Sequence, residues 1–489
     1  MNRDRVLTLY RRSTLVSTIG ILFFFLTLPT STGAEEDPGL ATLERPEFLT
    51  SGLYGGGLTF IGRDPYIQLQ AQPDIPLGKV NIGLDLVVLY NPYASDAGSQ
   101  FLAEDGESWD SPSTWLRLIR YVSYAHPYDP FYFRLGELDY LTIGHGSIMS
   151  GYSNYDRRGL RVNLRESNNR YGVETMLNDL GNPLIFGGRL FYRPFLRQEN
   201  NNFFTRLELG TTYLTDIDPS PQEDGEEPLI ALGVDAGFPI IERSTFRLDL
   251  YNDLAVLNTA SEAPGVVPEE LLETEPVEQK PTRRLESDPI GGEATPATEF
   301  AWGNAVGIGF AFPKVSFKFE YRILEAGYIP SVFDYTYESA KSLSREPDMS
   351  DFLDIETNSQ QRRGFFSQIF WKPGEQLQLF GTFEDYDNSS PKLYMAAVAS
   401  ELIPRFRVQG FYTKRDIGEG AEANFFGDLF NLNEKSAFGL QIGYAIYPPV
   451  ETIITREYRF RRVGTAEEGG SQFEAIHKTS FMVGIRTDF

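Results

Sequence analysis

The stretch Lys314–Arg322, KVSFKFEYR, alternates apolar with charged side chains along most of its length. One parity holds Val315, Phe317, Phe319 and Tyr321, and the other holds Lys318, Glu320 and Arg322. Residues two apart point to the same face of a β-strand, so this period indicates a strand whose two faces meet different surroundings. The same alternation occurs in VNIGLDLVV at 80–88 and in LRVNLR at 160–165. The sequence therefore predicts an all-β protein built from two-faced strands.

Short proline-containing breaks and long polar stretches take turns between these segments. Proline cannot donate to a strand ladder, so breaks such as Phe312–Lys314 and Tyr447–Pro449 indicate chain reversals. Long polar stretches occur at 91–114 and 326–363, among other places. This asymmetry is typical of a transmembrane antiparallel up-and-down β-barrel with short periplasmic turns and long extracellular loops. We count about 20 segments, of which those near 52, 65, 131 and 170 are weak, and predict about 18 strands, within 16–20.

Composition excludes several classes of protein. The chain has 489 residues, no cysteine, and a formal net charge of −24. Without cysteine there is no disulfide scaffold, zinc ribbon, iron–sulfur site or thiol catalysis. A nucleic-acid partner is disfavoured, because phosphate binding needs clustered Lys and Arg.

The N-terminal 34 residues have the pattern of a secretory signal. Arg3, Arg5, Arg11 and Arg12 precede the apolar stretch Leu15–Leu28, and Thr32–Ala34 supplies small residues for cleavage. The apolar stretch has 14 residues, whereas a membrane-spanning helix needs about 20. We expect a signal peptide at 1–34, a short periplasmic segment at 35–51, and the barrel at 52–489.

The C-terminal segment TSFMVGIRTDF carries a family resemblance. Phe481, Val483 and Ile485 alternate with other residues, and the chain stops on Phe489. This resembles the C-terminal signature strand of Gram-negative outer-membrane β-barrel proteins, although Thr487 stands where an aromatic residue is common. The resemblance implies that Phe481, Val483, Ile485 and Phe489 form the signal that the barrel-assembly machinery reads. It also implies a cell outer-membrane location among outer-membrane lipids.

The parity opposite the apolar face predicts the pore lining. It collects Arg134, Arg161, Arg165, Arg206, Arg247, Lys318, Arg322, Arg405, Arg407, Arg459 and Arg461, with the acidic residues Glu208, Glu320 and Glu384. A barrel of this predicted size is too wide for side chains to fill, so it leaves an aqueous channel. We predict a porin-like channel for passive diffusion of small hydrophilic solutes, with an Arg-rich lumen that favours anions. The alternative for these charges is that they keep the lumen wet and cross-link the wall.

Loop composition supplies a constriction hypothesis and a second function. Residues 139–158 are rich in Gly and Tyr and nearly uncharged until Asp156. By analogy with porin loops that fold inward, the candidate constriction residues are Tyr140, His145, Ser147, Tyr152, Asp156, Arg157 and Arg158; an extra hairpin is the alternative. Acidic loops at 218–228 and 261–300 suit a non-conducting surface or adhesion protein, which is the alternative function.

Catalytic and metal-binding patterns are weak. His145 lies two residues before Ser147, so a barrel hydrolase is conceivable, but GHGS is not a nucleophile elbow. We therefore predict no enzyme, no catalytic residues, no metal site and no cofactor. A homo-oligomer remains open.

Overall fold

The computed structural model describes residues 52–486 except 95–99, 103–114, 128, 155–156, 197–202, 220–227, 259–299, 336, 339–360, 388, 419–424, 434 and 464–471. The described residues belong to one compact unit, Leu40–Phe489. The predicted signal peptide, the segment 35–51, Asp156, Phe489 and most of both acidic loops lie outside the described residues. So do the side chains of Arg459 and Arg461.

The described chain is almost entirely strand. The strands are β1 (Leu53–Ile61), β2 (Asp64–Gln72), β3 (Asp74–Leu77), β4 (Val80–Leu84), β5 (Leu86–Tyr90), β6 (Phe101–Leu102), β7 (Ile119–Tyr124), β8 (Phe131–Gly136), β9 (Gly159–Arg165), β10 (Tyr171–Leu177), β11 (Ile185–Tyr192), β12 (Glu208–Asp216), β13 (Leu229–Arg243), β14 (Phe246–Leu257), β15 (Ala301–Ala311), β16 (Val315–Leu324), β17 (Arg362–Gly374), β18 (Leu377–Tyr386), β19 (Lys392–Ser400), β20 (Phe406–Lys414), β21 (Ser436–Tyr447), β22 (Val450–Val463) and β23 (Gln472–Arg486). Two short helical turns are η1 (Phe203–Arg206) and α5 (Phe425–Leu429). Within the described ranges, no helix is both long and apolar enough to span a membrane.

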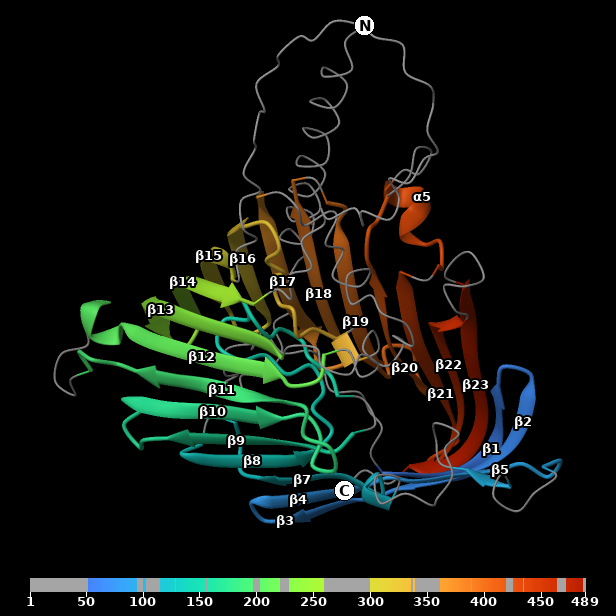
Figure 1. Cartoon of the computed structure of the whole chain (residues 1–489). Helices are drawn as coiled ribbons and strands as arrows, with labels where there is room; N and C mark the ends of the chain where they lie inside the picture. The colour runs from blue at the N-terminus through green and yellow to red at the C-terminus, as the bar shows by residue number, and fades with distance from the viewer. Residues whose placement is uncertain are drawn as a thin grey trace, which may run out of the picture. The chain divides into compact units, whose positions relative to one another are not determined.

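All 23 strands belong to one antiparallel sheet, and the sheet closes on itself (Figure 1). Consecutive strands from β7 to β23 pair with each other, and β1 pairs with both β2 and β23. Three strand positions around the wall consist of two segments each. The first is β2 followed by β3, and the second is β4 followed by β5. The third consists of β6 and β7, which pair with β5 and β4 respectively. When each of these three pairs of segments is counted once, the 23 segments occupy 20 strand positions around the wall. The predicted barrel class is confirmed.

The 20 positions lie at the upper limit of the predicted 16–20 and above the central value of about 18, because the weak segments are real strands. The segment near 52 becomes β1, whose glycines give it poor strand propensity. A Cβ added at Gly57 would lie 1.9 Å from the carbonyl oxygen of Phe481, so this position, at the seam with β23, needs glycine.

The two faces of the wall differ as the alternation predicts. On β14, Leu250 and Leu254 are 39% and 42% exposed, whereas Tyr251 and Asp253 between them are 6% and 3% exposed. A closed sheet with large apolar side chains on its outer face is the arrangement of an outer-membrane β-barrel, in which those side chains meet lipid. The residues Phe481, Val483 and Ile485 also lie exposed on one face of β23.

The connections confirm the predicted asymmetry of the two ends. Residues 244–245, 375–376 and 448–449 are two-residue turns at one end, which we call the turn end. The other end, the loop end, carries most of the long connections, including 137–158, 325–361 and 415–435. Two connections depart from the pattern: 62–63 is a tight turn at the loop end, and 193–207 is a long connection at the turn end.

Candidate functional site

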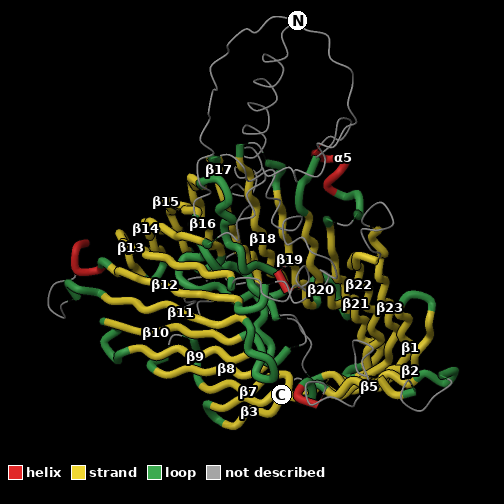
Figure 2. Tube along the Cα trace, in the orientation of Figure 1, coloured by secondary structure: helices red, strands yellow, loops and turns green. Residues whose placement is uncertain are grey.

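The loop 137–158 lies on the enclosed side of the wall. The Tyr140 ring contacts the rings of Phe380 on β18 and Tyr394 on β19, with centroids 4.9 and 5.2 Å apart. On other strands, His145 contacts β13 and β14, and Asn154 donates to the carbonyl of Asn178 after β10. One loop can reach the same face of so many strands only from the concave side of a closed sheet. Figure 2 shows green loop segments crossing the space between the strands.

A second loop, 325–338, packs against the first. Met149 and Phe333 form a parallel bridge, and the amide of Ser331 donates to the carbonyl of Ser147 over 2.8 Å. Both loops contribute to one buried apolar cluster with the inner faces of β10–β16. The polar composition of 326–363 predicted an external loop, so this insertion was not expected. The signal was available in the run of apolar and aromatic residues from Tyr328 to Tyr337.

A buried carboxylate joins the two loops to the wall. Glu338 accepts hydrogen bonds from the Tyr152 hydroxyl over 2.5 Å and from the Asn178 amide over 3.0 Å, and it forms an ion pair with Arg157 over 2.8 Å. Burial raises the pKa of Tyr152 well above its usual range, and the Glu338 carboxylate raises it further. Tyr152 therefore stays a neutral donor, and the loops have a fixed polar anchor inside the barrel.

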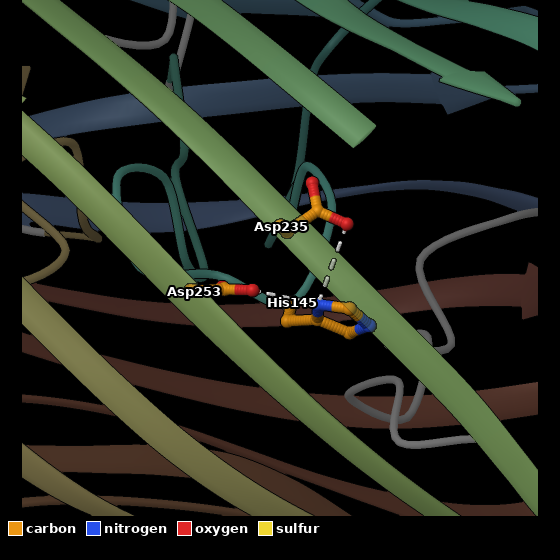
Figure 3. A group of neighbouring side chains, drawn as sticks. All are labelled: His145, Asp235 and Asp253. Carbon is orange, nitrogen blue, oxygen red and sulfur yellow. Dashed lines mark hydrogen bonds and ion pairs between the residues drawn. The ribbon is translucent and has the colours of Figure 1, made fainter. Parts of the chain in front are cut away.

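His145 forms a second anchor, which Figure 3 shows. Its Nδ1 lies 2.8 Å from Asp253 on β14 and 3.8 Å from Asp235 on β13. Its ring stacks on Tyr251, with centroids 4.1 Å apart and planes 15° apart. The Lys318 ammonium on β16 donates to the backbone carbonyl of His145 over 2.5 Å. Burial lowers the pKa of the imidazole, but the two carboxylates outweigh it, so the pKa of His145 lies above its ordinary value.

The cluster of His145, Asp235 and Asp253 could be considered as a metal site, because one ligand atom from each lies within 4.8 Å of the others. However, Arg189 already holds both oxygens of Asp235, over 2.9 and 2.6 Å. A divalent cation there would face that guanidinium and compete with it. The hydrogen bond between the imidazole Nδ1 and the Asp253 carboxylate explains the geometry without a metal.

Most of the charges predicted to line the pore are paired. On β16, Glu320 bridges Lys318 and Arg322 over 2.8 and 2.6 Å, and all three side chains are at least nine-tenths buried. The predicted residues that form ion pairs with described partners are Arg165, Arg247, Lys318, Arg322, Arg407, Glu208, Glu320 and Glu384. Arg206 lies in η1 and Arg405 in the turn before β20, so neither lies on a strand. The wall is therefore a network of opposite charges as well as a row of arginines.

Arg134 and Arg161 differ from these paired cations. They are directly opposite each other on β8 and β9, so their side chains share the inner face. The Arg134 guanidinium donates to the carbonyl of Glu137 over 3.1 Å and lies 4.5 Å from the centre of the Tyr121 ring. The Arg161 guanidinium lies 5.7 Å from the centre of the Tyr132 ring. Among the described residues, neither guanidinium forms an ion pair with a carboxylate.

Among the described contacts, the side chains of His145 and Ser147, the residues considered for catalysis, are not hydrogen-bonded to each other. His145 Nδ1 is held by Asp253, and the described interactions of Ser147 run through its backbone carbonyl. Of the remaining predicted constriction residues, Tyr140 packs on the wall, Tyr152 and Arg157 join Glu338, and Arg158 is buried and donates to the carbonyl of Arg117.

Similarity to known proteins is weak at the level of both sequence and structure. No family model matches the sequence, and no curated protein matches it. Among solved structures, the outer membrane protein OprD from Pseudomonas aeruginosa is 10% identical, with 92% of this chain and 98% of that chain covered and a TM-score of 0.26. The siderophore receptor PiuA from Acinetobacter baumannii is 9% identical, with 89% and 81% covered and a TM-score of 0.28. The copper transporter OprC is 12% identical, with 91% and 82% covered and a TM-score of 0.33. At these values the fold assignment depends on the strand pairing described above.

Proposed function

We propose that this protein is an outer-membrane channel through which small hydrophilic solutes diffuse passively, and that its inner wall favours anions. The observation that carries the proposal is a closed sheet with 20 strand positions, an apolar outer face and a charged inner face. Barrels of 16–18 strands already enclose more space than their own side chains can fill. The two inserted loops narrow this space, as the constriction loop of a channel would.

The inner wall beyond the two loops carries amides and hydroxyls beside paired charges, such as Glu451 between Arg407 and Arg486. The described loop contacts reach from β10 to β20, where Tyr335 meets Phe411. Further round, the Gln409 amide donates to Gln441 over 2.7 Å, and the Thr59 hydroxyl donates to Ser480 over 2.9 Å. We infer that solutes pass between the inserted loops and this wall of amides and hydroxyls, which can replace the hydrogen bonds of water.

The anion preference is assigned to Arg134 and Arg161. An arginine in an ion pair presents little net charge, so the paired residues of the wall add little to selectivity. The two guanidinium groups on β8 and β9 present adjacent charge without a described carboxylate partner. Guanidinium groups bind carboxylate and phosphate oxygens through paired hydrogen bonds, so a solute with such a group should dwell there.

Reversal potentials in a salt gradient across a planar bilayer test the assignment. Wild-type protein should give a potential of anion sign, and the double variant Arg134→Gln/Arg161→Gln should move it toward zero. The matched control is Lys314→Gln/Lys372→Gln, which removes the same charge from the turn end and should leave the potential nearly unchanged. A wild-type potential of cation sign would exclude the anion preference, and absence of conductance would exclude the channel.

A further inference from the structure

The loop 415–435 covers part of the outer face of the barrel. Lys414, at the end of β20, is fully buried, yet it lies on the outer parity opposite Leu393. Its ammonium contacts Asp428 Oδ1 over 2.9 Å and the backbone carbonyls of Asp428 and Asn431 over 2.7 and 2.6 Å. On the same parity, the Tyr412 hydroxyl donates to the carbonyl of Leu429. These contacts fix α5 against the outside of the wall.

A row of aromatic rings connects the wall to α5. Phe319 on β16, Phe365 on β17 and Phe383 on β18 lie side by side on the outer face, with centroids 5.9 Å apart at each step. The row continues to Phe425 on α5 over 6.4 Å, and to Phe426 over 5.3 Å. The aromatic surface that faces lipid on the strands therefore extends without interruption onto the loop.

The side of α5 that points away from the wall, together with Phe430 directly after it, is apolar and exposed. Phe426 is 68% exposed and Phe430 is 72% exposed, which is more than Phe319 on the strand wall at 38%. Two large aromatic side chains left in water beside a lipid-facing wall would be unfavourable. At the boundary between lipid and water, aromatic rings are preferred residues.

We propose that α5 and the adjoining Phe430 form a membrane-interface element, in which Phe426 and Phe430 insert into the lipid around the loop end of the barrel. The occupant is lipid because the patch is continuous with the outer face of β16–β18. The ion pair between Lys414 and Asp428 then holds the loop at the membrane surface. This placement keeps part of the loop 415–435 away from the mouth of the barrel.

Labelling with a polarity-sensitive fluorophore tests the proposal, since the chain has no native cysteine. Single variants Phe426→Cys and Phe430→Cys are labelled, and the full-length protein is folded into vesicles of phosphatidylcholine with brominated acyl chains. We expect both labels to be quenched to an extent similar to a label at Val306→Cys, which lies exposed on the outer face of β15. A label at Glu375→Cys, in an exposed turn at the turn end, should keep most of its fluorescence.

The controls separate the possible outcomes. Heat-modifiable gel mobility first confirms that each variant is folded. Quenching at Val306 with none at Phe426 and Phe430 would overturn the proposal and leave the membrane barrel intact. If the two labels escape quenching, and this protection from quenching disappears when the protein is diluted, a second copy of the chain covers α5. That result would also overturn the proposal. Absence of quenching at Val306 would instead contradict the lipid-facing wall.

Discussion

Replacing His145 by alanine should loosen the grip of the loop 137–158 on the inner wall. The imidazole makes a charge-assisted hydrogen bond to the buried Asp253 and stacks on the Tyr251 ring. A hydrogen bond to a charged group contributes about 1.5–3 kcal/mol, and an aromatic contact adds about 0.5–1.5 kcal/mol. The expected loss is about 2–4.5 kcal/mol, or roughly a 30- to 1,600-fold shift from the docked toward the released loop.

Single-channel recording measures this shift. Because Glu338 and the apolar cluster still hold the loop, we expect more frequent current fluctuations in His145→Ala and no loss of the barrel. The matched control is His126→Ala, which removes a histidine from the connection 125–130 at the turn end and should leave the current unchanged. If His145→Ala were as quiet as wild type, the His145 anchor would not hold the loop.

The same anchor predicts a pH dependence of defined sign. The pKa of His145 is raised above its ordinary value, so its stabilising contribution is complete below that ordinary value, near pH 6.5. The contribution is lost as the pH rises through the raised pKa, when the imidazole loses its charge. Wild-type current should therefore become noisier with rising pH, whereas His145→Ala should show no such change. The opposite slope in the wild type would contradict the ion-pair account.

Two further predictions concern the wall. Gly57→Val places a Cβ 1.9 Å from a backbone oxygen of the facing strand, so we expect the seam between β1 and β23 to fail and the heat-modifiable folded band to disappear; Gly374→Ala, which meets nothing within 4 Å, should fold normally. Glu320→Ala leaves two buried cations without their shared partner, which costs about 3–5 kcal/mol, so the temperature of heat modification should fall. Glu375→Ala, an exposed carboxylate, should leave that temperature nearly unchanged, and equal effects would refute the role of the buried network.

The strand wall could be predicted from the sequence because lipid and water impose period two on residues such as Phe319 and Glu320. The number of strands was harder to predict. At the seam, the backbone of β1 lies close to that of β23, which requires glycines, and glycines give a weak local signal for a strand. The Gly- and Tyr-rich composition of 139–158 predicted that this loop folds inward.

Its partner loop was missed because its role depends on contacts across the barrel, such as Met149 with Phe333. The pairing of the wall charges was missed for a related reason. Residue parity places Arg322 and Glu320 on one face, but it does not say that the two groups neutralise each other. That neutralisation leaves Arg134 and Arg161 as the adjacent cations on which the proposed selectivity depends.

The proposed function requires that this barrel encloses an open path for water and solutes. The most direct test is the conductance of the purified wild-type protein in a planar bilayer, after heat-modifiable mobility has shown that it is folded. We expect discrete steps of current that scale with salt concentration. A folded, inserted protein that carries no current across the accessible range of voltage and pH would contradict it.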